Sequence, residues 1–326
     1  MIPVTVLTGF LGSGKTTLLA RLLRTPAFAR TAVIINEFGE VGIDHDLVAA
    51  SDESYVQLET GCLCCLVRGD LEATLADLLG RRQSGAVGPF ERIVIETSGL
   101  ADPAPVLNAV MAETGRGAPI RLDAVVTTID AVNGLATLAR EPQSVRQVAV
   151  ADRLILTKTD LAPAGSDAAL IERVAALNPR APLMIAVRGE IDPALLLAAS
   201  DFDEASEPRL LAPPAGHDPE IGCIAIRRDE ALPALALTLF LEALADHCGA
   251  DLLRFKGLFN IAEHPAQPAV VHGVQHLFHE PQWLDRWPSA DHGSRIVLIG
   301  RGLSALWVEH LLDTLAAEVR EVEAIG

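Results

Sequence analysis

The chain has 326 residues, of which 50% are hydrophobic and 21% charged, with a formal net charge of −17. This length allows two domains, the apolar content excludes disorder as a global state, and the acidity argues against a nucleic-acid-binding surface. No apolar run reaches the ~20 residues that span a bilayer, and no secretory signal precedes the first strand-like segment, so we expect a cytoplasmic protein without a membrane segment.

The first predicted element is an alternating apolar strand that ends at Gly9 and is followed by Gly14, Lys15 and Thr16. The spacing is G-x-x-x-x-G-K-[ST], which is typical of a phosphate-binding loop between a strand and a helix. Glycines let backbone N–H groups point at a phosphate anion, and the helix that follows adds the positive end of its dipole. We expect Lys15 to contact the β- and γ-phosphates and the Thr16 hydroxyl to bind Mg²⁺.

Strands and helices then alternate along the chain, which predicts a mainly parallel sheet with helices on both faces, an α/β fold. Further strands are expected at 32–35, 55–58, 92–96, 125–129, 153–156 and 183–186, and helices at 18–23, 70–79 and 168–177. Pro103 and Pro105 are interpreted as breakers. Ligands of such sheets bind at the carboxyl ends of the strands, so Gly9, Glu96 and Thr157 are expected to converge on one crevice.

Two loops of this domain carry the residues expected to respond to the nucleotide. Glycines among acidic residues at 36–44 predict a switch loop that contains Glu37 and Glu40. Glu96 ends an apolar strand and fits an acidic residue that holds a water on Mg²⁺, with Gly99 near the γ-phosphate; the alternative is an ordinary solvated carboxylate. Lys15, Thr16 and Glu96 are therefore the expected catalytic residues. No residue is identified as the hydrolytic base, so slow intrinsic turnover is expected.

The segment Thr157-Lys158-Thr159-Asp160 differs by one residue from the guanine-binding pattern N-K-x-D. In that pattern the aspartate accepts hydrogen bonds from guanine N1–H and N2–H, and the lysine stem lies against the base. Asp160 and Lys158 keep both parts, while Thr157 replaces an amide by a hydroxyl. The segment therefore favours GTP over ATP, and an ATP-dependent kinase or ATPase is the alternative.

Five cysteines, three of them at Cys62, Cys64 and Cys65, do not resemble a disulfide framework. Thiolates select zinc or other soft transition metals, so we expect a divalent metal bound by two thiolates with Glu37, Glu40 or a histidine. Buried small hydrophobes or a redox pair remain as alternatives. Because the cluster follows the predicted switch loop, a metal held there could sense the γ-phosphate.

The composition becomes rich in Glu, Pro, Ala and Ser from 201 to 219, and after this segment the spacing of the apolar residues changes. We therefore divide the chain into a nucleotide-binding domain (1–205), a linker (206–219) and a smaller α+β domain (220–326). The second domain is predicted to have strands at 221–227, 252–261, 269–278 and 295–300 and helices at 232–245 and 306–319. Its loosely grouped histidines are interpreted as surface or strand residues, with a metal role as the alternative: His264, His272, His276 and His279.

Taken together and in order, these motifs resemble the CobW family of P-loop GTPases. The resemblance is carried by G-F-L-G-S-G-K-T-T, N-E-F-G-E-V-G-I-D, E-T-G-C-L-C-C, E-T-S-G-L-A-D-P and T-K-T-D, and in the second domain by L-L-R-F-K-G and G-V-Q-H-L-F. The family pattern assigns phosphate and Mg²⁺ contacts to Gly12, Ser13, Gly14, Lys15, Thr16 and Thr17, guanine contacts to Lys158 and Asp160, and metal ligands to Cys62, Cys64 and Cys65.

The resemblance implies a metal-responsive GTPase or metallochaperone that hydrolyses GTP to GDP and hands zinc to a client metalloprotein. Cobalt or iron delivery to one client enzyme, or a metal sensor or buffer without transfer, are the alternatives. Relatives would be the nickel-handling HypB and UreG proteins. Two departures from the family pattern are Thr157 in place of Asn and the lack of a histidine-rich stretch in the linker. The oligomeric state is left open, with a homodimer among the options.

Overall fold

The computed structural model describes residues 1–36, 55–57, 63–67, 70–163, 165, 167–197 and 221–325. The chain divides into two compact units, Met1–Ala175 with Ala181–Ser200 and Ala176–Arg180 with Asp201–Gly326. The predicted linker at 206–219 and the predicted switch residues Glu37 and Glu40 lie outside the described residues. Within the described ranges, no helix is long and apolar enough to cross a membrane.

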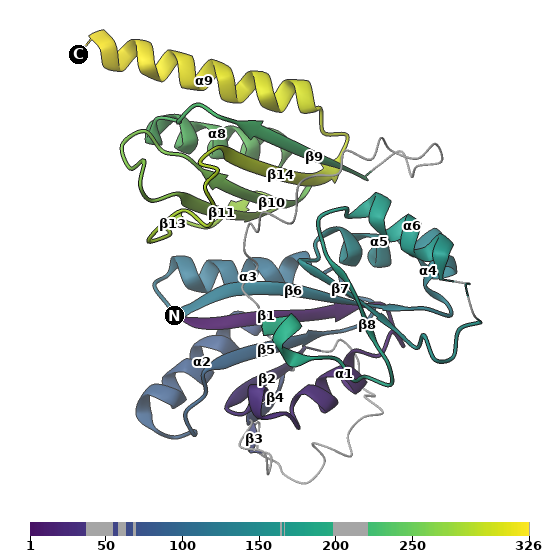
Figure 1. Ribbon diagram of the computed structural model, residues 1–326. Helices are drawn as coiled ribbons and strands as arrows, with labels where there is room; N and C mark the ends of the chain where they lie inside the picture. Colours follow the sequence, from purple (N-terminus) through teal and green to yellow (C-terminus); the bar gives the residue numbers. More distant parts are fainter. Residues whose placement is uncertain are drawn as a thin grey trace. The chain divides into compact units, whose positions relative to one another are not determined.

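The first unit is built on an eight-stranded sheet with the order β3-β4-β2-β5-β1-β6-β7-β8 (Figure 1). All neighbours in it pair in parallel except β3, which is antiparallel to β4. The strands are β1 (Ile2–Gly9), β2 (Thr31–Asn36), β3 (Tyr55–Gln57), β4 (Leu63–Val67), β5 (Arg92–Thr97), β6 (Ile120–Asp130), β7 (Arg153–Thr157) and β8 (Leu183–Ala186). The predicted α/β fold is confirmed.

Helices flank this sheet and bury its apolar strands (Figure 1). They are α1 (Lys15–Leu22), α2 (Leu71–Ser84), α3 (Ala104–Gly115), α4 (Gly134–Arg140), α5 (Pro142–Ala149), α6 (Ala168–Leu177) and α7 (Pro193–Leu197), with a 3₁₀ turn at Pro26–Phe28. Leu18 and Leu22 of α1 pack into one cluster with alternate strand residues such as Leu7, Val94 and Val126. Parallel strands covered by helices read as near-continuous apolar runs, which is why β1, β5 and β6 stand out in the sequence.

The structure differs from the predicted elements mainly at short segments. Pro103 and Pro105 do not break the chain but lie at the start of α3, where a fixed φ and a missing N–H suit the first helical turn. The helices α4 and α5 were not predicted, because each spans only two turns. The cysteine segment contributes β4, a strand that pairs with β2 and β3 and was not among the predicted strands.

The second unit is an antiparallel sheet packed against two helices, as predicted. Its main path is β12-β11-β10-β14-β9, and β13 pairs with β11. The elements are β9 (Ile221–Arg228), α8 (Ala234–Cys248), β10 (Leu252–Phe259), β11 (Ala269–Val274), β12 (Leu277–Phe278), β13 (Gln282–Trp283), β14 (Ser294–Arg301) and α9 (Ala305–Ile325). Phe240, Phe255 and Phe259 lie in its core. The strand predicted at 269–278 is two strands, because the chain turns at Gln275, whose φ is 55°.

Candidate functional site

The phosphate-binding loop joins β1 to α1 with a backbone that only glycine accepts at two positions. Gly9 has φ 142°, and a Cβ there would lie 2.4 Å from Thr128 Oγ1 and 2.5 Å from its carbonyl oxygen. Gly14 has φ 91° and is the N-cap residue of α1, which begins at Lys15. The loop is therefore pressed against the end of β6, with the N-terminus of α1 directly behind it.

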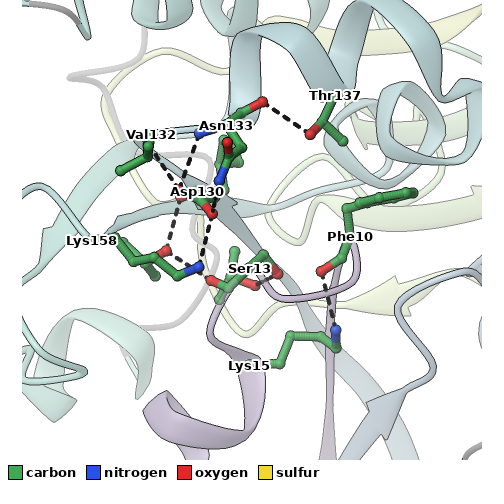
Figure 2. Close-up of polar contacts among 11 residues, drawn as sticks. Phe10, Ser13, Lys15, Asp130, Val132, Asn133, Thr137 and Lys158 are labelled. Carbon is green, nitrogen blue, oxygen red and sulfur yellow. Dashed lines mark hydrogen bonds and ion pairs between the residues drawn. The ribbon is translucent and has the colours of Figure 1, made fainter. Parts of the chain in front are cut away.

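Lys15 lies over this loop, and its side chain is buried. The residue is 7% exposed, and Nζ donates to the carbonyl oxygens of Gly9 at 3.0 Å and Phe10 at 3.4 Å (Figure 2). These contacts hold the ammonium group at the loop, in an otherwise acidic chain. A concentrated positive charge beside backbone N–H groups is the arrangement that binds phosphate anions.

Thr16, the residue after Lys15 in α1, contacts Glu96 of β5. Thr16 Oγ1 donates to Glu96 Oε1 at 2.6 Å, and Glu96 is 5% exposed. Glu96 lies in β5 in register with Leu7 of β1 and Ile35 of β2. A buried carboxylate and a hydroxyl on neighbouring elements form a hard oxygen donor set, which fits Mg²⁺.

The 98–102 loop follows β5 and lies directly on the phosphate-binding loop. A Cβ on Gly99 would lie 2.6 Å from the Cα and the N of Leu11, so the two backbones touch. Ser98 N–H donates to the carbonyl oxygen of Asn36 at 2.9 Å, which ties the same loop to the end of β2. Gly99 therefore lies beside the phosphate-binding loop, and its place near the γ-phosphate stays a prediction.

Thr157 connects the predicted guanine-binding segment, residues 157–160, to the phosphate-binding loop. Its Oγ1 donates to the carbonyl oxygen of Ser13 at 2.7 Å and lies 3.1 Å from that of Ile129. The Ser13 hydroxyl in turn bonds that of Thr128 at 2.7 Å. The Thr157 hydroxyl, which replaces the usual asparagine amide, thus donates its hydrogen bond to the phosphate-binding loop.

Lys158 is held by an aspartate that the sequence analysis did not identify. Lys158 has a left-handed φ of 58°, and its Nζ lies 2.8 Å from Asp130 Oδ2 (Figure 2). Asp130 also accepts from Val132 N–H at 2.8 Å and from Asn133 N–H and Nδ2 at 3.2 Å each. The pattern Asp130-x-x-Asn133 at the end of a buried strand is the signal that could have revealed it.

These hydrogen bonds lower the pKa of Asp130. Burial by itself would raise that pKa, but the hydrogen bonds from Lys158, Asn133 and the backbone of Val132 and Asn133 outweigh it. Asp130 is therefore ionised near neutral pH. The predicted guanine contact Asp160 follows Lys158 by two residues, and its carboxylate lies 3.6 Å from Arg188 Nε.

A cavity of about 270 Å³ lies beside the phosphate-binding loop. Its walls are residues 10–13 of the loop, the end of β6, the start of α4, one face of α5 that includes Ser144 and Gln147, and Lys158. The cavity therefore borders both the phosphate-binding loop and the predicted guanine-binding segment.

The predicted metal ligands are only partly within the described residues. Cys62, Glu37 and Glu40 lie outside them, and Cys64 and Cys65 lie in β4, in register with Val33 and Ile34 of β2. Across the described ranges, no group of three or more His, Cys, Asp and Glu side chains could hold a metal ion. The four loosely grouped histidines of the second unit form no such group with the other described residues: His264 and His276 are exposed, His272 lies in β11, and His279 is buried directly after β12, neither at the surface nor in a strand.

The fold and the loop geometry define a nucleotide-binding protein of the P-loop class with an added antiparallel domain. A family model described as CobW/HypB/UreG, nucleotide-binding domain, matches residues 3–185, and one described as Cobalamin synthesis protein cobW C-terminal domain matches residues 221–316. The chain belongs to the CobW/HypB/UreG family, as its motifs predicted.

Named relatives are similar along nearly the whole chain. The zinc chaperone YjiA of Escherichia coli is 35% identical over 304 residues, which are 92% of this chain and 94% of that protein. The zinc chaperone CobW of Pseudomonas aeruginosa is 33% identical over 356 residues, covering 97% and 92% of the two chains. The crystal structure of Zn(II)-bound YjiA GTPase from E. coli matches with a TM-score of 0.73 at 32% identity, covering 96% of this chain and 98% of that one.

Proposed function

We propose that this chain is a GTPase that couples hydrolysis of GTP to the binding of Zn²⁺ and its transfer to a client metalloprotein. Two kinds of observation support the proposal. The similar proteins are named zinc chaperones or a zinc-bound GTPase, and the geometry supplies a phosphate cradle with a guanine-type segment attached to it.

The nucleotide half of the proposal assigns each group a role. Backbone N–H groups of the loop and Lys15 bind the phosphates of GTP and neutralise charge that develops on transfer. Thr16 and Glu96 would hold Mg²⁺, which supplies charge neutralisation between the β- and γ-phosphates when bound. Lys158 and Asp160 select guanine, and Gly99 faces the γ-phosphate.

The metal half is Zn²⁺ as cargo on Cys62, Cys64 and Cys65, with Glu37 or Glu40 completing the set. Thiolates and carboxylates are both zinc ligands. The observation that carries the coupling is the sheet register. Cys65 of β4 pairs with Ile34 of β2, which pairs with Ile95 of β5, next to Glu96. Two strand spacings are about 10 Å, so the backbone of Cys65 lies about that far from the strand that carries Glu96.

The test is a Zn²⁺ titration of the purified protein with and without a non-hydrolysable GTP analogue. Coupling free energies of about 1–3 kcal/mol predict Zn²⁺ affinities that differ roughly 5- to 150-fold, and Zn²⁺ must change the analogue's affinity by the same factor. Lys15→Ala should abolish the difference, and Cys64→Ser with Cys65→Ser should abolish high-affinity Zn²⁺ binding. Identical Zn²⁺ affinities with and without the analogue would overturn the coupling.

The same titration separates the alternatives. Tighter binding of Co²⁺ or Fe²⁺ than of Zn²⁺ in the presence of the analogue would favour delivery of cobalt or iron to one client enzyme. Zn²⁺ binding without GTP hydrolysis would favour a metal sensor or buffer. Competition of GTP with ATP tests the base selectivity, which favours GTP if Lys158 and Asp160 act as assigned.

A further inference from the structure

Side chains of α5 form hydrogen bonds with the 98–102 loop, and these α5 residues lie outside the family motifs. Gln147 of α5 is 0% exposed, and its Nε2 donates to the carbonyl oxygens of Gly99 at 3.3 Å and Ala101 at 3.1 Å. Two carbonyl acceptors on the same side require the amide nitrogen there, which fixes the orientation of the side chain.

A second contact fixes the far end of the loop. Arg146, the neighbour of Gln147 on α5, places Nη1 2.6 Å from Asp102 Oδ2. The other carboxylate oxygen of Asp102 accepts from Ala104 N–H at 3.0 Å at the start of α3. The pair is about one-third exposed, so its ionic part is screened, but it sets where the loop ends and α3 begins.

The helix that makes both contacts is itself anchored to the sheet. Thr127 Oγ1 of β6 donates to the backbone carbonyl of Gln147 at 2.7 Å. Gln147 also lines the 270 Å³ cavity, together with residues 10–13 of the phosphate-binding loop. Because the 98–102 loop lies next to this open space, the hydrogen bonds from α5 fix its position there.

We infer that Gln147 and Arg146 are positioning residues that hold the 98–102 loop on the phosphate-binding loop, with Gly99 set to meet the γ-phosphate. The inference rests on the proposed GTPase function and adds residues that act through Gly99 without touching the nucleotide. GDP has no γ-phosphate, so loss of the contact should weaken the binding of GTP and leave that of GDP unchanged.

The test compares Gln147→Leu with Gln143→Leu, the same change one turn earlier on α5 at a half-buried residue. Losing two neutral hydrogen bonds should lower kcat and the affinity for a non-hydrolysable GTP analogue about tenfold, with the GDP affinity within twofold of the wild type. Gln143→Leu should change neither. Equal weakening of analogue and GDP binding, or an unchanged kcat, overturns the inference.

A second variant keeps the test decisive if Gln147→Leu does not fold. Asp102→Asn removes the charge that binds Arg146 on a partly exposed pair and keeps the oxygen that accepts from Ala104 N–H. It should lower kcat about threefold and spare GDP binding, and a GDP effect of the same size overturns the inference. A wild-type protein that hydrolyses no GTP would instead refute the proposed function, which distinguishes the two failures.

Discussion

The contact between Asp130 and Lys158 predicts a loss of GTP affinity when the charge of Asp130 is removed. At an N–O distance of 2.8 Å, Coulomb attraction at an effective dielectric constant of 20 is about 6 kcal/mol. Because Lys158 is 34% exposed and Asp130 11%, solvent screening and desolvation reduce the net value to about 1–2 kcal/mol. Asp130→Asn should therefore weaken GTP binding roughly 5- to 30-fold.

Asp130→Asn removes the charge of the side chain and keeps the local hydrogen bonds of the loop after β6. Asparagine keeps the side-chain oxygen that accepts from Val132 and Asn133 N–H, so these bonds survive. The assay is the Kd of a fluorescent GTP analogue, with Asn133→Ala as the control, which removes one hydrogen bond from an uncharged donor to the same carboxylate, keeps the ion pair with Lys158, and should cost less than about threefold. A GTP affinity of Asp130→Asn within twofold of the wild type would refute the role of Asp130.

The lowered pKa of Asp130 also fixes the pH dependence of this contact. A carboxyl group whose folded pKa is lowered contributes above its usual pKa and loses that contribution only as the pH falls through the lowered value. The difference in GTP affinity between the wild type and Asp130→Asn should therefore stay constant from pH 9 to pH 5. A difference that shrinks on acidification to pH 6 would contradict the ion pair.

Three further outcomes are expected. Glu96→Gln should raise the Mg²⁺ concentration for half-maximal GTP hydrolysis at least tenfold, because the buried oxygen pair loses its charge; an unchanged Mg²⁺ dependence would remove Glu96 from the metal site. Gly99→Ala should lower kcat about 10²-fold, since its Cβ would overlap the Leu11 backbone at 2.6 Å, whereas Gly80→Ala, with open space around it, should keep full activity. Burial, aided by Arg254, lowers the pKa of His279 to about 4, so the unfolded chain takes up a proton first as the pH falls below 6.5. Urea unfolding should thus show the second unit losing about 2 kcal/mol between pH 7 and pH 5, and a His279→Gln variant that loses as much would contradict this cause.

The elements of the first unit that the sequence predicts are those whose physical cause is local. The strands β1, β5 and β7 are buried apolar runs that carry Gly9, Glu96 and Thr157 at or next to their carboxyl ends. Because the ends of parallel strands share one edge of the sheet, the convergence of Gly9, Glu96 and Thr157 could be expected without coordinates. The structure brings Thr16 to Glu96 and Thr157 to Ser13 as that expectation requires.

The residues that the sequence did not reveal act through tertiary contacts. Gln147 lies among Val145, Val148 and Ala149 on a two-turn helix. The neighbouring sequence does not show whether such a glutamine is buried and bonded to a loop or exposed at the surface. In the sequence, Asp130 is only the polar residue that ends a strand. Its contact with Lys158 forms in the folded chain, where Lys158 follows the neighbouring strand β7. For β4, pairing with β2 decides the strand, and the local sequence of three cysteines does not.

The phosphate-binding loop contacts both the predicted guanine-binding segment and the loop that carries Gly99. On one side Thr157 donates to the Ser13 carbonyl, and on the other the backbone of Leu11 touches Gly99. A displacement of residues 11–13 of the loop would therefore move Thr157 and Gly99 together. Loss of the Thr157 hydroxyl should therefore reduce the discrimination between GTP and GDP as well as the selectivity for guanine, because the loop that reads the phosphates is the same one that the predicted guanine-binding segment holds in place.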